Sequence, residues 1–211
     1  MDFECFDVRL GIMKHWKDID LFVAIKEGDK DALSVLFLRY NDYLKHYGLQ
    51  IVPDSSLVEE CIQELFIYIF ESYERLSAVT YVKAYLFRSL RRRVLEKVQK
   101  EQRQKTSDME FACLAHFQFS EENLLLEEEI QSDTRKALAD ALNNLPWGQR
   151  EAIYLRYYNG LKTKEIAEIM GVANQTVLNT LHQALKKIQK DKHLSKLLGF
   201  TASWLLMLMQ A

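Results

Sequence analysis

The segment between Leu161 and Ile188 constrains the fold more than any other part of this 211-residue chain. It reads LKTKEIAEIMGVANQTVLNTLHQALKKI, the pattern of two short helices joined by a turn at Gly171. Glycine adopts a positive φ at the lowest cost, which suits that turn. The small Ala167 lets the second helix cross closely, and Val177 points back into the angle between the helices. The pattern predicts a helix-turn-helix that presents its second helix to a DNA major groove; an ordinary helical hairpin is the alternative.

Helices are expected throughout the rest of the chain. Only 7 Gly and 2 Pro are present, and the apolar residues recur at spacings of three and four rather than alternating. The length allows two modules, each able to bury a core. Within the helix-turn-helix, the same spacing assigns the small core to Ile166, Met170, Val172 and Leu181.

The reactive residue types exclude several function classes. The three cysteines, Cys5, Cys61 and Cys113, are far apart and form no C-x-x-C pair, and the five histidines are scattered. This pattern argues against a disulfide framework and against zinc, and it fits a reducing, cytoplasmic location. No phosphate loop or carboxylate pair near a histidine supports an enzyme, so we expect no catalytic residue, metal or cofactor. The first sixteen residues contain acids and no long apolar run, unlike a secretory signal.

Charge is distributed unevenly, although the net charge is only −2. The segment 83–105 carries nine Lys or Arg residues against two acids, and 108–133 carries eight acids with no Lys or Arg. Tyr81, Tyr85 and Phe87 lie within or beside the basic run, which favours a surface for phosphates and bases over a merely solvated helix face. The reversal of charge suggests two different partners.

A first module of four helices is expected over residues 18–104. Two helices are separated at Gly28, and Asp29 is placed to cap the second, which is expected to end near Gly48. A third helix follows Pro53, and its candidate caps are Asp54, Ser55 and Ser56. A long fourth helix starts around Thr80 and runs through the basic cluster.

The remaining chain divides into a connector, a second module and a tail. Residues 105–131 contain FACLAHFQF, which lacks clean periodicity, followed by acids, and we interpret them as an acidic linker. The second module, 132–192, begins with an amphipathic helix; Pro146 then opens a helix that stops at Asn159 and Gly160. The tail, 193–211, is apolar but shorter than the roughly 20 residues of a bilayer span. It is expected to pack on the second module or on a partner, without stable membrane insertion.

Four segments together carry a family resemblance: GDKDALSVLFLRYNDYL, EECIQELFIYIF, AYLFRSLRRRVLEKV and LNNLPWGQREAIYLRYYNGLKTKEIAEIMGVANQTV. In this order and spacing, the chain resembles sigma-70 family RNA polymerase sigma factors of the extracytoplasmic-function (ECF) group, which keep only sigma domains 2 and 4. The resemblance spans Ile19 to Lys190. It implies that 18–104 is domain 2, 105–131 the linker and 132–192 domain 4.

The resemblance also implies roles for individual residues. Core polymerase would be bound at the clamp of its largest subunit by the acidic helix, through Glu60, Gln63, Glu64 and Phe66. The −10 element would be melted and held by Tyr81, Lys83, Tyr85, Arg88, Arg91 and Arg92. Domain 4 would bind the polymerase flap and contact the −35 element through Thr163, Asn174, Gln175, Thr176, Asn179, Thr180, Gln183, Lys186 and Lys187. An anti-sigma factor is a common further partner in the family.

Two departures from the family pattern affect DNA recognition. The basic helix has Arg92 and Glu96 where members often carry Asn and Asp. The recognition helix has uncharged residues, Leu178, Asn179, Thr180 and Gln183, where Lys, Ser and Arg are common. Amides still pair with adenine edges, but fewer cations neutralise phosphates, so we expect weak −35 binding.

Weak −35 binding leads to the hypothesis that an accessory DNA-targeting protein, conventional or RNA-guided, helps recruit the chain to promoters. The simpler alternative is weak reading of an A/T-rich −35 box. A rival of a different class is a dimeric helix-turn-helix regulator that acts without core polymerase. Such a regulator would need neither the acidic helix, nor the basic helix, nor the acidic linker.

Overall fold

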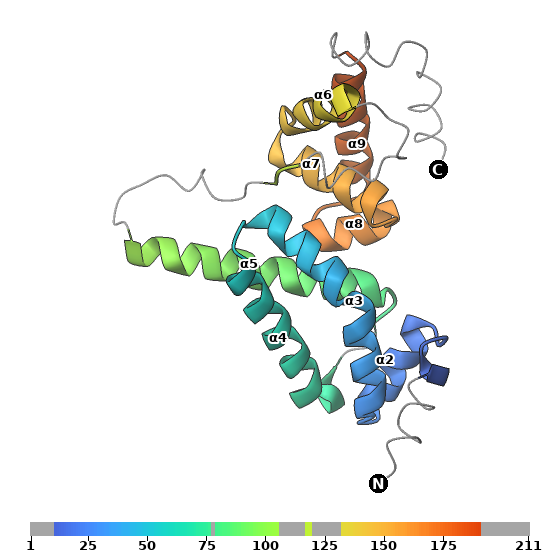
Figure 1. Cartoon of the computed structure of the whole chain (residues 1–211). Helices are drawn as coiled ribbons and strands as arrows, with labels where there is room; N and C mark the ends of the chain where they lie inside the picture. The colour runs from blue at the N-terminus through green and yellow to red at the C-terminus, as the bar shows by residue number, and fades with distance from the viewer. Residues whose placement is uncertain (1–10, 77–78, 106–116, 120–131, 191–211) are drawn as a thin grey trace. The chain divides into compact units, whose positions relative to one another are not determined.

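The computed structural model describes residues 11–76, 79–105, 117–119 and 132–190, and every regular element in those ranges is a helix (Figure 1). The expected all-α fold is therefore confirmed for the described part of the chain. The chain divides into two compact units, residues 1–114 and 115–211. Each unit has its own core and is described separately.

Unit 1 is built around one long central helix, α3 (Lys30–Ile51), which packs against the other three. These are α2 (Asp18–Lys26), α4 (Ser55–Glu71) and α5 (Val82–Lys105), and a short 3-10 turn, η1 (Tyr73–Arg75), follows α4. The largest fully buried side chains of this unit are Tyr47, Phe22 and Phe87, together with Leu21, Leu36, Leu44, Ile51, Ile62, Leu65, Ile69 and Leu86. The core thus draws on all four helices, and it fixes the outward faces of α4 and α5.

Two aspartates begin the helices of unit 1 as the sequence predicts. The Asp29 carboxylate accepts hydrogen bonds from the backbone N–H groups of Asp31 and Ala32, at 2.9 and 3.1 Å. The Asp54 carboxylate accepts one from the N–H of Leu57 at 3.0 Å. Each carboxylate satisfies donors that have no partner inside the helix, so the Asp29 cap is confirmed, and of the three candidates at α4 the cap is Asp54.

The expected helix end near Gly48 is wrong. α3 continues to Ile51, and Gly48 lies inside it, buried against α4. A Cβ atom added to Gly48 would lie 2.5 Å from Cγ1 of Val58, far inside van der Waals contact. Glycine is therefore present at this position because α3 and α4 approach each other closely, not because the helix stops.

Unit 2 contains α6 (Ser132–Asn143), α7 (Trp147–Ile153), α8 (Thr163–Met170) and α9 (Asn174–Gln189). The helix that the sequence predicts after Pro146 changes character midway, because residues Tyr154–Tyr158 form a π-helix, η3, directly after α7. There the N–H of Asn159 donates to the carbonyl of Tyr154, five residues earlier, at 3.2 Å. The chain then turns at Gly160, with φ +63°.

The helix-turn-helix consists of α8 and α9. Gly171 takes the left-handed conformation, φ +68°, as its place in the turn predicts. Ile166, Ala167, Val177 and Leu181 are buried between the helices. The assignment of Val172 to this core is wrong, since its side chain is 39% exposed directly after the left-handed turn, and Met170 is only half-buried.

The predicted linker and tail fall largely outside the described residues. The acidic stretch lies in 106–116 and 120–131, and the apolar tail lies in 191–211, so these interpretations stay predictions. The exception is Phe117–Phe119, which packs on unit 2. Among the described residues, no helix is both long and apolar enough to cross a membrane.

Candidate functional sites

The acidic side of α4 faces the basic helix α5. Lys97 Nζ lies 2.9 Å from Glu60 Oε1 and 2.8 Å from Glu64 Oε1. Arg93 Nη1 lies 3.9 Å from Glu64 Oε2, and its guanidinium covers the Tyr68 ring. Partial burial opposes the charge on Lys97, but its hydrogen bonds to the two carboxylates outweigh this and raise the pKa of its ammonium group.

This pairing still leaves the acidic face accessible to a partner. The Glu60 side chain is 62% exposed and that of Glu64 is 41% exposed. Lys97, which is only 24% exposed, contacts both carboxylates from the α5 side, so the rest of their surface stays open to solvent. A cationic partner can therefore approach these carboxylates from the solvent side without displacing Lys97.

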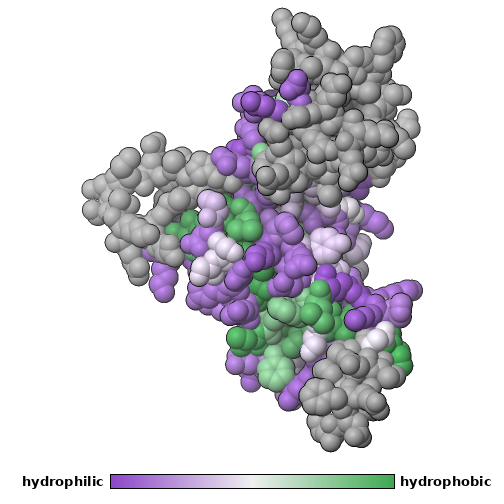
Figure 2. All heavy atoms as spheres, in the orientation of Figure 1, coloured by the Kyte–Doolittle hydropathy of each residue, from purple (hydrophilic) through white to green (hydrophobic). Residues whose placement is uncertain are grey.

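An open apolar groove of about 610 Å³ lies beside this face, between α3 and α4. Gln63 and Phe66 line it, together with Leu33, Ser34, Phe37, Leu38, Ile67 and Phe70. Apolar side chains gather over these two helices in Figure 2. Exposed apolar surface of this kind is typical of interaction sites.

The residues that the groove exposes are not all the ones that the sequence analysis expected to contact a partner. Phe66, expected to meet a partner, is only 7% exposed and packs edge-to-face on Phe37 at 5.1 Å between ring centroids. The exposed apolar residues of the groove are Leu38, Ile67 and Phe70, at 63%, 54% and 43%. Sequence reasoning missed these three, although each falls outside the periodic core stripe of its helix, which is the signal that identifies them.

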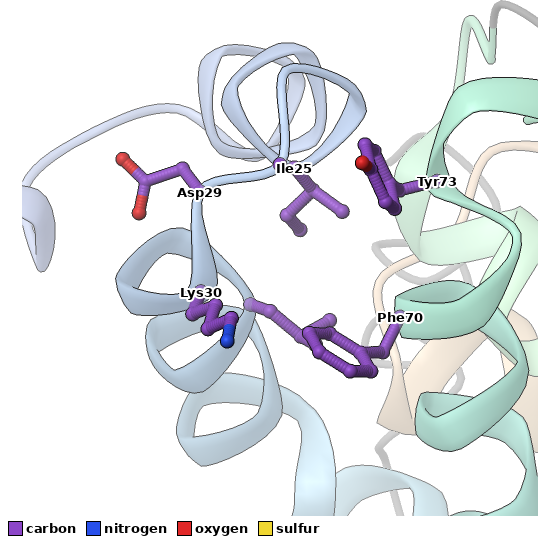
Figure 3. A pocket seen from close by; sticks show the side chains of 7 residues that line it. Ile25, Asp29, Lys30, Phe70 and Tyr73 are labelled. Atoms are coloured by element: carbon purple, nitrogen blue, oxygen red, sulfur yellow. The ribbon is translucent and has the colours of Figure 1, made fainter.

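A smaller cavity of about 230 Å³ lies at the end of α4 (Figure 3). Lys30 and Phe70 lie side by side there, with Lys30 Nζ 5.4 Å from the ring centroid, and Tyr73 and Ile25 complete the wall. The carboxylate of Asp29 is occupied as the α3 cap. Throughout the described part of the chain, no cluster of three His, Cys, Asp or Glu side chains is arranged to hold a metal ion.

The predicted −10 residues lie on α5 and in the approach to it, with different degrees of exposure. Arg88 and Arg92 are exposed, and Arg92 Nε pairs with Glu96 Oε1 at 2.7 Å. Lys83 and Arg91 are half-buried. The exposed cations form a face that suits a nucleic-acid backbone.

The aromatic residues near α5 are arranged differently from the prediction. Tyr81 and Tyr85 are half-buried, and Tyr85 packs edge-to-face on Phe22 at 5.6 Å between centroids. Burial raises the pKa of the Tyr85 hydroxyl. Tyr43 of α3 is 51% exposed and has Lys83 Nζ over its ring at 5.3 Å. Tyr43 is thus the more accessible ring for stacking an unpaired base, and sequence reasoning missed it.

The predicted −35 residues are grouped by the structure on one module, mostly on the outward side of α9. Gln175, Thr176, Asn179, Gln183, Lys186 and Lys187 are exposed, and Thr163, Asn174 and Thr180 are half-buried. Two hydrogen bonds preorganise this surface. Gln175 Nε2 donates to Asn179 Oδ1 at 3.1 Å, and Thr180 Oγ1 donates to the Thr176 carbonyl at 2.7 Å. Leu178, 43% exposed, lies among these uncharged groups, so α9 carries no Lys or Arg before Lys186.

Comparison with known families agrees with this architecture. Residues 36–104 match the family model described as Sigma-70 region 2, and residues 135–188 match Sigma-70, region 4. The two matches lie in the two units, one in each. The chain thus joins a sigma region 2 to a sigma region 4 that holds the helix-turn-helix.

Similar proteins indicate the group of the family to which the chain belongs. The ECF RNA polymerase sigma factor SigK of Mycobacterium ulcerans is 23% identical over 80% of this chain and 90% of its own length. SigX of Bacillus subtilis, also an ECF sigma factor, is 25% identical over 78% and 86%. The chain belongs to the sigma-70 family of RNA polymerase sigma factors, in the ECF group, and it acts with RNA polymerase in promoter-directed transcription.

Two solved structures share the fold. CnrH, in complex with the cytosolic domain of CnrY, has a TM-score of 0.56 at 18% identity, over 82% of this chain and 94% of its own. RpoE of Bartonella quintana, in complex with the anti-sigma factor NepR, has a TM-score of 0.51 at 22% identity, over 78% and 94%. Identities this low support the fold alone.

Proposed function

We propose that this sigma factor binds core RNA polymerase through the acidic side of α4 and the adjoining α3–α4 groove. Supporting this, Glu60 and Glu64 lie next to an open apolar groove that Gln63 also lines. Charge at the rim attracts a basic partner, and apolar area in the groove provides affinity. Binding to the polymerase would take place in the cytoplasm.

Charge reversal on α4 tests this interface. Gln63→Lys with Glu64→Lys is expected to abolish comigration with core polymerase in gel filtration and to abolish abortive transcription from a pre-melted template. Glu71→Lys, a reversal at the end of the same helix, is the matched control and should retain both activities. If the wild-type chain bound duplex DNA but did not associate with core polymerase at all, the dimeric regulator would be favoured instead.

Lys97→Met separates docking from folding. Like Glu64→Lys, this variant breaks ion pairs between α4 and α5. Any destabilisation of unit 1 that follows from losing these pairs is therefore present in both variants. If α4 docks on the polymerase, Lys97→Met keeps its affinity for core, because Glu60 and Glu64 remain and lose a competing cation. Equal loss of binding in Lys97→Met and Glu64→Lys would mean that the pairs serve only to stabilise unit 1.

For promoter DNA, we propose that α5 holds the melted −10 strand and that α9 reads the −35 element. The exposed Arg88 and Arg92, with Tyr43 beside Lys83, offer cations and a stacking platform. Tyr43→Ala should reduce opening of a duplex promoter and spare initiation from a pre-melted bubble. Permanganate reactivity of unpaired thymines measures the opening, and equal losses on both templates would argue against a melting role.

Recruitment by an accessory DNA-targeting protein is a second proposal, supported by the uncharged surface at the start of α9. Gln183→Arg should raise −35 affinity and steepen its dependence on salt, because each new phosphate contact releases counterions. Footprints of the holoenzyme with and without a candidate partner test the recruitment itself. Strong −35 protection by the wild-type holoenzyme without a partner would refute it.

An anti-sigma factor is a further proposed partner. Both solved relatives are complexes, one with the cytosolic domain of CnrY and one with the anti-sigma factor NepR. We expect such a partner to compete with core polymerase for this chain. Simultaneous binding of both, measured by gel filtration, would contradict this.

A further inference from the structure

Two phenylalanines from the middle of the predicted linker are buried in unit 2. Phe117 is fully buried and Phe119 is 3% exposed, while Gln118 between them is exposed. This inward–outward–inward alternation is that of a β-strand laid on a surface. The match to sigma-70 region 4 begins only at residue 135, so these residues lie outside it.

The side chain of Asn143, the last residue of α6, binds the backbone of this segment. Its Oδ1 accepts a hydrogen bond from the Phe119 N–H at 2.8 Å, and its Nδ2 donates to the Phe119 carbonyl at 2.9 Å. One side-chain amide thus supplies the donor and the acceptor that a neighbouring strand would offer. A buried backbone needs both partners, and no apolar side chain at position 143 can supply them.

The π-helix η3 forms the aromatic surface that receives the two phenylalanines. Tyr154 and Tyr158 stack with their rings 5.2 Å apart at an interplanar angle of 11°. Phe117 meets Tyr154 edge-on at 5.2 Å, and Phe119 lies 5.7 Å from Tyr158. A π-helix widens the helical turn and is uncommon. Its occurrence under this segment indicates a specific binding surface for the two phenylalanines.

We propose that Asn143 is a positioning residue that clasps the linker to unit 2 and thereby limits the distance between promoter elements that the protein can bridge. This proposal rests on the two-element promoter reading proposed above. In the clasped chain, the two units are joined only by the residues from Lys105 to Phe117. In a chain without the clasp, the join extends to Ser132.

The difference in reach is large on the scale of a promoter. An extended chain spans at most about 3.3–3.6 Å per residue, so the clasped tether reaches about 43 Å and the released tether about 97 Å. By their numbering, the −10 and −35 elements are about 25 base pairs apart, or about 85 Å at 3.4 Å per step. The clasp therefore more than halves the length of chain that can separate the two units, which lowers the longest promoter spacing that the protein can bridge.

Single-molecule energy transfer in the full-length chain tests the clasp itself. Azide-bearing residues at Lys100 and Glu168, both exposed, carry the dyes, and the native cysteines remain in place. Asn143→Ala should lengthen the mean distance between the dyes, by up to about 1.5-fold if it follows the square root of tether length. Asn144→Ala, a substitution at the adjacent exposed asparagine, should leave the distance unchanged.

Phe119→Ser releases the same segment from the opposite side of the clasp and should give the same lengthening as Asn143→Ala. Circular dichroism of each variant confirms that the helices are retained. Equal distances in wild type, Asn143→Ala and Phe119→Ser would overturn the clasp.

Transcription from promoters of different spacing tests its consequence. The measured quantity is the ratio of transcript from a spacer lengthened by two base pairs to transcript from the original spacer. This ratio should rise several-fold in Asn143→Ala and stay at the wild-type value in Asn144→Ala. Simple loss of stability lowers transcription from both promoters equally and leaves the ratio unchanged.

The outcomes separate this inference from the proposed function. A longer dye distance with an unchanged ratio would show that the clasp exists but does not govern spacing, which overturns the proposal as stated. If the wild-type chain supported no transcription with core polymerase, the proposed function would fail instead, and the dye distances would still decide whether the clasp exists.

Discussion

Gly48→Ala tests whether the close approach of α3 and α4 requires a glycine. The added methyl group would lie 2.5 Å from Cγ1 of Val58 and 3.1 Å from its Cγ2. Relieving such overlap in a packed core costs about 1–3 kcal/mol, whereas alanine in place of glycine stabilises a helix by about 1 kcal/mol. We expect the steric cost to exceed this gain, because Val58 is fully buried and cannot swing into solvent. The net loss of stability should be up to about 2 kcal/mol.

The compensating substitution gives the sharper measurement. Val58→Ala alone removes two buried methyl groups and leaves a cavity, which should cost about 2–3 kcal/mol. In the double variant, the methyl group added at position 48 enters the space that Val58 vacates, so the clash disappears and the helix gain remains. The double variant should therefore lose only about 1–2 kcal/mol, and the two substitutions should show a coupling equal to the relieved steric cost, about 1–3 kcal/mol.

Urea unfolding of unit 1 provides the assay. In a chain with Trp147 and Trp204 replaced by Phe, Trp16 is the one remaining tryptophan and reports on this unit. Additive effects, within about 0.5 kcal/mol, would refute the reasoning that Gly48 and Val58 share one contact. A stabilised Gly48→Ala would refute it as well, since helix propensity would then outweigh packing.

The start of α4 supplies a second prediction: Asp54→Ala removes its cap and should destabilise unit 1 by about 1 kcal/mol in the same titration. Burial raises the pKa of the Cys61 thiol to about 11. With Cys5 and Cys113 replaced by Ser, its alkylation at pH 8 should be about a hundredfold slower in the native chain than in concentrated urea, because little thiolate forms. Burial also raises the pKa of Tyr154 to about 12 from 10.0. The folded pKa exceeds the unfolded one, so the stabilisation present below pH 10 is lost between pH 10 and 12. Urea midpoints of unit 2 should fall across that window, and Tyr154→Phe should flatten the fall.

Local signals in the sequence were sufficient for most of the helical framework. Asp29, Asp54 and Gly171 act locally, through a cap or a turn; Asp29 and Gly171 were predicted correctly, and Asp54 was one of three candidate caps for its helix. Gly48 was misinterpreted because its reason lies in another helix. A glycine within an apolar stripe looks the same whether it ends a helix or admits a neighbour, and only the partner residue distinguishes the two cases.

The sequence shows the charged residues of the candidate sites but not how they pair in the fold. The acids of α4 and the cations of α5 are visible as separate runs, yet Lys97 contacts Glu64 across 33 positions of sequence. No helical spacing encodes that contact, because it depends on how α4 and α5 pack. The same limit explains Tyr43, which lies on α3 but stands beside Lys83 of α5.

The clasp shows why a linker is hard to recognise from composition. Helical periodicity needs several turns to register, whereas Phe117 and Phe119 show only one inward–outward–inward step, among residues that otherwise suggest a connector. Their partner Asn143 is equally inconspicuous, since asparagine at a helix end is ordinary local chemistry. The informative sign was energetic: two phenylalanines in a charged connector are costly in water unless some surface buries them. Unit 2 provides that surface through a π-helix, an element for which sequence spacing gives no signal, so this part of the protein required the structure.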